Sequence, residues 1–382
     1  MKLTFLHTAD WQLGKPFAST PEEAKRHRIQ QERLHAVQRM REVVEKSAAA
    51  FVLVAGDVFD SSQATKTTVS AACAAIGSLQ VPVLVIPGNH DHGGAGSIWE
   101  QEFFKREQQQ LAPNLRVLLT PEPLVLPQAI IFPAPLLRRH EAGDPTAWIR
   151  TAFADPNLPP GLPRIVLAHG TTQGFGDSAA VNLLDLSLLP TGEIDYIALG
   201  DWHGTKQVAP HAWYSGTPEI DRFPKGEGND PGNLLQVTVS RGLVPVVEKI
   251  SSSRFLWKEM AFRFSDDASL EVFAAELDTT IGLRSDEQLL LLSLDGSLGI
   301  EASARLEKIL ESWDSRLLRL KLEQRVSIAP TVEEITALTQ RADDPLIATV
   351  ASRLVSQLGS GDDEEVAIAQ LALRELHSAC FI

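Results

Sequence analysis

The chain begins with the stretch LTFLHTADWQLG, residues 3–14, in which a short apolar run meets polar side chains. Leu3 to His7 has the continuous apolar character of a strand that is buried on both faces. Asp10 and Gln12 follow it, with one tryptophan between them. Open α/β sheets bind their ligands beyond the carboxyl ends of their strands. This stretch therefore predicts a central strand that leads into a functional loop.

The same transition from apolar run to polar cluster recurs along the chain. Further strands are predicted at Phe51 to Val54, Val81 to Ile86, Ile130 to Phe132, Ile165 to Leu167 and Tyr196 to Leu199. Later polar clusters are Gly56-Asp57-Val58-Phe59-Asp60, Gly88-Asn89-His90-Asp91, His169-Gly170 and Gly200-Asp201-Trp202-His203. One such cluster is typical of a turn, but a series of them after apolar strands indicates a common site. Pro21 to Lys46 has apolar residues at helical spacing, so the predicted fold class is α/β, with helices on the faces of a sheet.

The sequence changes in character after about Ser251. Segments with alternating extended and helical patterns follow at Phe255 to Phe264, Leu270 to Leu277, Leu289 to Leu294, Ser303 to Trp313 and Leu317 to Leu322. This order predicts a compact β-α-β-α-β unit. Residues 331–376 look helical with a break at Gly359-Ser360-Gly361, and the acidic run Asp362 to Glu365 suits a first helical turn. We predict two domains, residues 1–250 and a smaller α+β cap with a helical tail at residues 251–382.

The formal net charge is -14 over 382 residues, with 35 Lys+Arg against 49 Asp+Glu. Residues 251–382 contain 13 basic and 23 acidic side chains, so most of the excess negative charge lies in the predicted cap and tail. Neutralisation of phosphates supplies most of the non-specific affinity of proteins for DNA. The composition therefore argues against a protein that wraps duplex DNA through a broad basic face.

The cysteines and the chain start carry little information about location. Cys73 and Cys380 are far apart and match no metal or redox spacing, which favours reduced thiols in a cytoplasmic protein. His7 and Asp10 come too early for a signal peptide, and no apolar stretch approaches the ~18 residues needed to span a bilayer. We expect a cytoplasmic protein with no membrane partner.

The order and spacing of the polar clusters resemble those of the calcineurin-like binuclear metallophosphoesterases, and more closely those of the SbcD-type DNA repair nucleases. The similarity rests on residues 5–11 with Leu13-Gly14, on Gly56 to Asp60, on Pro87 to Asp91 and on Tyr214-Ser215-Gly216-Thr217-Pro218. It covers about residues 1–250. The resemblance implies that this part is a catalytic domain with a four-layer sandwich of two mixed β-sheets flanked by helices.

Two divalent ions a few Å apart need a bridging carboxylate, further oxygen and nitrogen ligands, and an open position for water and phosphate. The resemblance implies that one ion is held by Asp10, Gln12, Asp57 and His203. It implies that the other is held by Asp57, Asn89, His169 and Asp201, with Asp57 as the bridge. Because strand side chains alternate, extended Asp-x-Gln and Asp-x-His segments would place both ligands on one face. Trp11 and Trp202 would then point away and pack in the core, with base stacking as the alternative.

Gln12 and Asp201 depart from the family pattern, which usually has histidine at both positions. Either the metal site has decayed, or its metal preference has changed. Both side chains can still ligate through oxygen, whereas a decaying site more often acquires residues that cannot coordinate at all. We favour a changed preference and, since carboxylate and amide oxygens suit hard ions, we predict two Mn²⁺ ions as cofactors.

The resemblance gives His90 a separate role, because the family histidine at this position faces the phosphate and assists the leaving oxygen. A nearby acid would keep this histidine charged, and Asp60 is the candidate, with a helix N-cap as its alternative role. The implied mechanism is in-line attack of water on phosphorus without a covalent intermediate. The two ions would offset the charge that develops on the non-bridging oxygens.

Basic residues before position 250 form local groups only. These groups are Lys25-Arg26-His27-Arg28, Arg138-Arg139-His140 and Lys206. Arg138, Arg139 and Lys206 are predicted to bind substrate. Phe17 and Phe175 lie near the first and fourth clusters, where aromatic rings would stack on unpaired bases. For each of these residues, a solvated charge or a packed ring is the alternative.

We therefore expect a stand-alone, Mn²⁺-dependent DNA endonuclease that favours single strands and acts in DNA repair. A narrow groove for one strand fits local basicity better than duplex wrapping does. DNA is the expected partner, and a homodimer and other repair proteins are further candidates. Three alternatives stay open: an SbcD-like 3'-5' exonuclease subunit that works with an ATPase, a small-molecule phosphodiesterase, and a non-catalytic interaction module.

Overall fold

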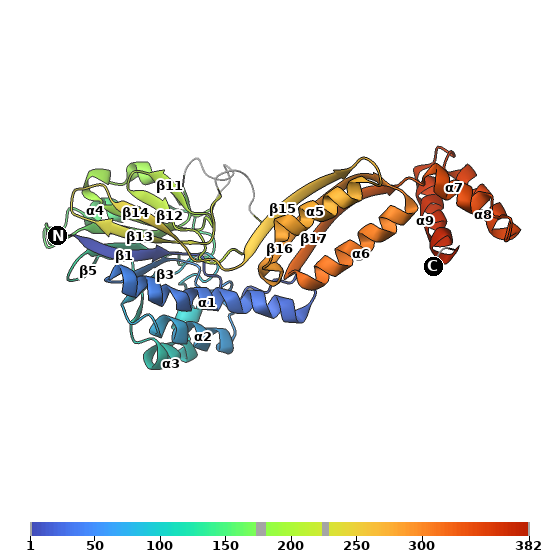
Figure 1. Cartoon of the computed structure of the whole chain (residues 1–382). Helices are drawn as coiled ribbons and strands as arrows, with labels where there is room; N and C mark the ends of the chain where they lie inside the picture. The colour runs from blue at the N-terminus through green and yellow to red at the C-terminus, as the bar shows by residue number, and fades with distance from the viewer. Residues whose placement is uncertain (1, 173–180, 224–228, 381–382) are drawn as a thin grey trace. The chain divides into compact units, whose positions relative to one another are not determined.

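Figure 1 shows the computed structural model of the chain, which describes residues 2–172, 181–223 and 229–380. The chain forms two compact units, Met1–Arg254 and Phe255–Ile382. The division lies in the connection between strands β14 (Val246–Ser251) and β15 (Leu256–Phe264), just after the predicted one. None of the described helices is long and apolar enough to cross a membrane.

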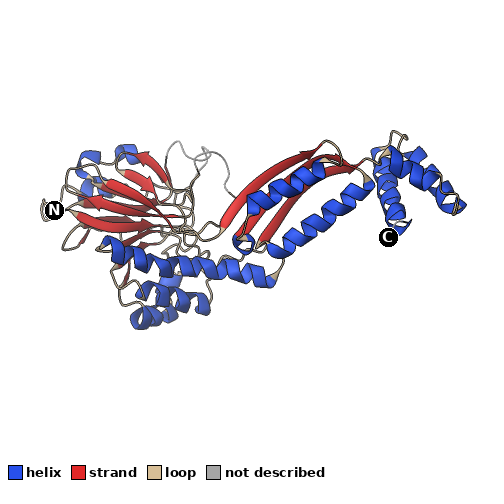
Figure 2. Ribbon diagram, in the orientation of Figure 1, coloured by secondary structure: helices blue, strands red, loops and turns tan. Residues whose placement is uncertain are grey.

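The first unit contains two six-stranded sheets, whose strands are red in Figure 2. The first sheet has the order β14-β13-β1-β2-β3-β4. Its other strands are β1 (Leu3–Thr8), β2 (Val52–Ala55), β3 (Val83–Ile86), β4 (Leu115–Val117) and β13 (Asn233–Val239). Strands β1 to β4 are parallel, and β13 is antiparallel to both β1 and β14. The carboxyl ends of β1, β2 and β3 therefore lie at one end of a mixed sheet.

The second sheet has the order β11-β12-β10-β7-β6-β5 and is also mixed. Its strands are β5 (Leu124–Val125), β6 (Ile130–Ala134), β7 (Arg164–His169), β10 (Tyr196–Gly200), β11 (Lys206–Ala209) and β12 (Ala212–Tyr214). The four central strands are parallel, and the two edge strands are antiparallel to their neighbours. A short parallel pair, β8 (Thr171–Thr172) and β9 (Leu183–Leu184), follows β7.

Residues along each central strand alternate between two cores, because successive side chains point to opposite faces. In β2, Leu53 and Ala55 are buried between the sheets with Leu167 of β7. Val52 and Val54 instead share a core with apolar residues of three helices. These are α1 (Glu23–Ser47), α2 (Lys66–Gly77) and α3 (Glu102–Leu111), the last preceded by the short η1 (Ile98–Glu100). Full burial of each such aliphatic side chain contributes about 1.5–3 kcal/mol, so both faces hold the strands in place.

Shorter helical segments cover the outer face of the second sheet. Phe132 and Val166 are buried there with Ile149, Leu189 and Ile194. The segments are α4 (Ile149–Ala152), η2 (Leu186–Leu188) and η3 (Thr191–Glu193). The layers are thus helices, sheet, sheet and helical segments. This confirms the predicted sandwich of two mixed sheets flanked by helices.

The predicted strands are present with shifted ends, and other strands were missed. Strand β7 continues to His169, beyond the apolar run that predicted it, because its pairing with β10 extends to that residue. Strands β13 and β14 were not predicted. Leu235 to Val239 alternates apolar and polar residues, which was an available signal for β13, whereas its pairing with β1, as in the partners Phe5 and Val237, has no local signal.

The second unit has the predicted β-α-β-α-β order. Its elements are β15, α5 (Ser269–Ile281), η4 (Ser285–Glu287), β16 (Gln288–Leu298), α6 (Ile300–Arg316) and β17 (Arg319–Ile328). The strands form a parallel sheet in the order β15-β16-β17. Phe264, Phe273, Leu292 and Leu306 are buried between this sheet and its two helices.

Three helices complete the second unit, α7 (Val332–Thr339), α8 (Pro345–Gln357) and α9 (Asp363–Cys380). Asp363, Glu364 and Glu365 lie in the first turn of α9, as predicted for the acidic run. The break at residues 359–361 separates α8 from α9, also as predicted.

Candidate metal centre

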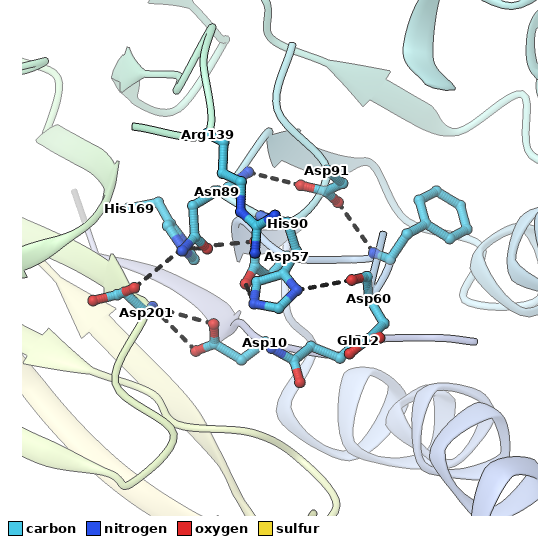
Figure 3. Close-up of polar contacts among 12 residues, drawn as sticks. Asp10, Gln12, Asp57, Asp60, Asn89, His90, Asp91, Arg139, His169 and Asp201 are labelled. Carbon is cyan, nitrogen blue, oxygen red and sulfur yellow. Dashed lines mark hydrogen bonds and ion pairs between the residues drawn. The ribbon is translucent and has the colours of Figure 1, made fainter. Parts of the chain in front are cut away.

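Polar side chains from both sheets meet beyond the carboxyl ends of the central strands. Asp10 follows β1, Asp57 follows β2 and Asn89 follows β3. His169 is the last residue of β7, and Asp201 follows β10. Figure 3 shows these side chains gathered in one group. The structure thus brings together predicted ligands that are up to about 190 positions apart in the sequence.

Four of the predicted ligands have left-handed backbone. The angle φ is +55° at Asp10, +42° at Gln12, +55° at Asp57 and +102° at Asp201. The expectation that the first and last motifs are extended segments is therefore wrong. The loop after β1 instead runs alongside the loop after β2, because Asp10 N donates to Gly56 O (3.1 Å) and Gln12 N donates to Asp57 O (2.9 Å). Strained backbone of this kind costs about 1–3 kcal/mol per residue and is concentrated at functional sites.

The two tryptophans of these motifs pack against apolar cores. Trp11 is buried in the core beneath α1 and α2, and its Nε1 donates to Thr8 Oγ1 (2.9 Å). Trp202 is half-buried against the core on the outer face of the second sheet. Core packing of Trp11 is thus confirmed. The physical reason differs from the predicted one, because no strand alternation directs these rings.

Glycines allow the ligand loops to approach one another closely. A Cβ at Gly56 would lie 2.3 Å from His169 Nδ1, and φ there is +91°. A Cβ at Gly88 would lie 2.1 Å from Asp57 Oδ1. Side chains at either position would displace a predicted ligand. The Gly-Asp and Gly-Asn pairs of the sequence therefore reflect close packing of the site.

Four electron-rich atoms converge on one half of the centre, which we call the histidine half. His169 Nε2 lies 3.2 Å from Asn89 Oδ1, 3.7 Å from Asp57 Oδ1 and 3.8 Å from Asp201 Oδ1. His169 Nδ1 donates to the Ala55 carbonyl (2.7 Å), which leaves Nε2 to face the three oxygens. Ligands at right angles about 2.1 Å from an ion lie about 3.0 Å apart, close to the shorter of these distances. The histidine half fits a divalent ion.

The carboxylates around this half carry an excess of negative charge. Among the described residues, Asp10, Asp57 and His169 form the group of acidic and histidine ligand atoms that all lie within 4.8 Å of one another. Burial alone would lower the pKa of His169, but Asp57, Asp10 and Asp201 raise it to about 9. Burial raises the pKa of Asp10 to about 6, although His203 and His169 oppose this. A divalent ion neutralises such a cluster.

Gln12 and His203 have different surroundings. They form, with Lys15 and Asp221, the other half of the centre, which we call the lysine half. Lys15 Nζ donates to Gln12 Oε1 (2.6 Å) and to Asp221 Oδ2 (2.6 Å). Gln12 Nε2 lies 3.3 Å from His203 Nε2, and His203 Nδ1 lies 3.1 Å from Asp221 Oδ1. This orientation of the Gln12 amide is the favourable one, because the flipped amide would turn its NH₂ group toward the Lys15 ammonium. The amide oxygen predicted to bind metal thus accepts from a lysine.

A second cation belongs to the lysine half. Arg222 Nη2 donates to Asp221 Oδ2 (3.1 Å) and lies 3.1 Å from His203 Nδ1. Burial alone would raise the pKa of Asp221, but His203, Arg33 and Arg222 hold it well below its ordinary value. Sequence analysis did not identify Lys15, Asp221 or Arg222. Only the presence of Lys15 three residues after a predicted ligand was a local signal.

His90 is held by the backbone of the neighbouring loop. Its Nδ1 donates to the Asp60 carbonyl (2.8 Å), and its Nε2 lies 4.0 Å from Asp57 Oδ2. The side chain of His90 is 33% exposed, so its ring is accessible from solvent. Asp60 contacts His90 through its carbonyl group and not, as expected, through its carboxylate. Nor is Asp60 a helix N-cap, because Thr65 caps α2.

Two further buried residues position the ligand loops and were missed. The Asp91 carboxylate accepts from Gly88 N (2.8 Å) and Phe59 N (3.1 Å), and burial raises its pKa to about 7. The buried Arg33 guanidinium donates to the carbonyls of Asp10 (2.9 Å) and Trp11 (2.8 Å). An available signal was the place of Arg33 within the apolar stripe of its helix, where a charge requires a partner.

The predicted substrate residues lie at different depths. Arg138 and Arg139 are exposed after β6, and Arg139 points toward the site in Figure 3. Lys206 is half-buried at the start of β11. Phe17 is 7% exposed and therefore a packed ring, which was the alternative to base stacking. Phe175 lies outside the described residues.

Comparison with known proteins gives a family match and likenesses to solved structures. A family model described as calcineurin-like phosphoesterase matches residues 3–205. The structure of TT1561 from Thermus thermophilus has a TM-score of 0.41 at 12% identity, and the match covers 66% of this chain and 100% of that one. A dimetal phosphatase from Danio rerio has a TM-score of 0.38 at 13% identity, with 65% of this chain and 99% of that one covered.

Proposed function

The chain belongs to the calcineurin-like phosphoesterase family, and we propose that it is an Mn²⁺-dependent phosphodiesterase that cuts single-stranded DNA internally, in DNA repair. The observation that carries this proposal is the convergence of Asp57, Asn89, His169 and Asp201 on one point. The family makes the site a metal-dependent hydrolase site. The nucleic-acid substrate is our inference from the resemblance to SbcD-type nucleases and from the local basic residues, and the choice of Mn²⁺ is our inference from the oxygen ligands.

The ligands of the histidine half would hold the ion. Three oxygens and one imidazole nitrogen form a predominantly hard donor set, which suits Mn²⁺ better than softer metals. A bound ion would neutralise charge on the phosphate oxygens and make a water molecule more acidic. Thr171 Oγ1 donates to Asp201 Oδ2 (2.9 Å), which fixes that carboxylate with its other oxygen toward His169. Such outer contacts maintain ligand geometry.

We propose that His90 acts on the leaving group. The bond from Nδ1 to the Asp60 carbonyl fixes the ring plane and leaves Nε2 directed toward the centre. A protonated Nε2 there donates to a phosphate oxygen or transfers its proton to the departing 3' or 5' oxygen. Asp57 Oδ2 lies 4.0 Å from this nitrogen, and Asp57 Oδ1 receives a hydrogen bond from His90 N (3.0 Å).

Local cations support a polyanionic, single-stranded substrate. Arg138 and Arg139 are exposed, Arg139 points toward the site in Figure 3, and the Arg222 side chain is 53% exposed. Guanidinium groups bind phosphate through paired hydrogen bonds. A net charge of -14 disfavours a long duplex footprint, whereas a few arginines beside the metal suffice for one strand.

A closed single-stranded DNA circle with Mn²⁺ tests this function. We expect linear product and then shorter fragments, and we expect none with Asp57→Asn. An exonuclease has no end at which to start, so an intact circle with degraded linear DNA would replace endonuclease by exonuclease action. Cleavage of bis-p-nitrophenyl phosphate without cleavage of any DNA would point to a small-molecule phosphodiesterase. Turnover of none of these substrates would refute the proposal.

A further inference from the structure

The lysine half contains a cation of its own. The Lys15 ammonium bridges Gln12 Oε1 and Asp221 Oδ2, with both distances at 2.6 Å. The Lys15 side chain is 21% exposed and that of Asp221 is 1% exposed, so the ion pair is largely withdrawn from water. Ion pairs in such surroundings are screened much less than surface pairs. The ammonium is therefore a fixed element of the site.

Gln12 and His203, the two predicted metal ligands that belong to this half alone, are engaged by hydrogen bonds. Oxygen is the ligating atom of a glutamine side chain, and Gln12 Oε1 accepts from Lys15. The amide nitrogen of Gln12 faces His203 Nε2 at 3.3 Å, so it occupies the direction in which that nitrogen would ligate. A divalent ion would have to displace an amide donor while an ammonium remained beside its ligand. The lysine half in this arrangement does not fit a second ion.

The charges around the two halves also favour an ion in the histidine half over one in the lysine half. Lys15 and Arg222 both pair with Asp221, so the lysine half carries one more cation than this carboxylate neutralises. In the histidine half, the described contacts of His169 Nε2 are to the oxygens of Asn89, Asp57 and Asp201. The two cations of the lysine half oppose the binding of a dication there, whereas the oxygens around His169 Nε2 attract one.

We propose that this chain binds one divalent ion, in the histidine half, and that the Lys15 ammonium takes the place of a second ion. The inference rests on the metal centre of the proposed function and narrows it. The described contacts of Lys15 use two of its three N–H bonds. The third N–H bond is available to a phosphate oxygen. Lys15 thus offers the substrate part of the positive charge that a second metal ion would offer.

Manganese stoichiometry tests the inference without reference to activity. Gel-filtered protein loaded with Mn²⁺ should contain one ion per chain by elemental analysis. Its electron paramagnetic resonance spectrum should be that of an isolated ion, because only two ions a few Å apart couple magnetically. Two tightly held ions with a coupled spectrum would overturn the inference.

Substitution of Lys15 shows whether the lysine excludes the second ion. Lys15→Met removes the charge and frees Gln12 Oε1, so we expect a second, weaker Mn²⁺ and the appearance of coupling. Lys15→Arg keeps the charge and should stay at one ion. Lys46→Met, at an exposed lysine of α1, is the matched control and should also stay at one. A folded Lys15→Met protein that still binds one ion would contradict the role given to the lysine.

The result is separable from that of the DNA assay. A protein with one ion that leaves every DNA substrate intact would refute the proposed function and leave this inference standing. A protein with two coupled ions that cuts the circle would do the reverse. Should Lys15→Met fail to fold, the wild-type stoichiometry and Lys15→Arg still decide the question.

Discussion

The histidine half and the lysine half of the centre begin from similar sequence patterns and differ in their chemistry. Each takes polar residues from loops that follow buried parallel strands. In the histidine half, Asp57, Asn89 and Asp201 direct oxygens toward His169 Nε2. In the lysine half, the Lys15 ammonium donates a hydrogen bond to Gln12 Oε1.

A motif position therefore does not by itself decide whether a residue binds metal. Gln12 follows Asp10 at the spacing expected of a ligand, and its oxygen could coordinate. What decides its role is the charge beside it, since Lys15 and Arg222 meet there through Asp221. Variants that act on one half should therefore leave the other half intact.

The largest effect is expected from Asp57, which lies close to both His169 and His90. Asp57→Asn should lower hydrolysis at least about a thousandfold, because it removes a carboxylate from the predicted ion. Mn²⁺ content should fall with it, as measured by elemental analysis. Asp278→Asn, at an exposed position on α5, is the control. Substantial activity in Asp57→Asn would show that the histidine half is not the metal site.

His90 should affect the chemical step and not the metal. We expect His90→Gln to lower kcat roughly a hundredfold or more, as for loss of a general acid, with Mn²⁺ content unchanged. Single-turnover cleavage of a short DNA strand measures this step. His27→Gln, on an exposed face of α1, should behave as the parent protein. Loss of Mn²⁺ from His90→Gln would mean that this histidine is a ligand.

Thr171 offers a milder change in the histidine half. Thr171→Val removes the hydroxyl that donates to Asp201 Oδ2 and keeps the side-chain shape. Loss of such an outer contact should weaken Mn²⁺ binding about 10–100-fold. Calorimetric titration provides the comparison, with the exposed Thr191→Val as control. Equal affinities would show that Asp201 does not need this support to bind metal.

Taken per pH unit, the change in Mn²⁺ affinity should be the smallest of these effects. The pKa of His169 is raised to about 9, so the imidazole holds a proton at neutral pH that a metal must displace. Affinity should therefore rise with pH, by about tenfold per unit between about pH 6.5 and 8.5. Titrations across this range measure the slope. A flat profile would place the ion away from His169.

Much of the fold and of the histidine half was predictable because the signals are local. An apolar run followed at once by Gly-Asp or Gly-Asn marks the end of a buried strand. In a parallel sheet, these ends gather at one edge. The proximity of Asp57, Asn89, His169 and Asp201 depends on this pattern, whereas the sandwich of two mixed sheets was implied by the family resemblance.

The lysine half was not predictable because its contacts are remote and its backbone is unusual. Lys15 meets Asp221, which belongs to a loop more than 200 residues later, and no periodic pattern connects them. The left-handed angles at Asp10 and Gln12 follow from hydrogen bonds to the β2 loop and not from their own side chains. The place of β13 beside β1 was not predictable for the same reason, because the paired residues lie more than 200 positions apart in the sequence.

An anomalous-difference map from a crystal grown with Mn²⁺ shows directly whether the centre binds one ion or two. We expect one strong peak, bonded to His169 Nε2 and to oxygens of Asp57, Asn89 and Asp201, with Lys15 still between Gln12 and Asp221. A second peak of equal height between Gln12 and His203, or no peak beside His169, would contradict it.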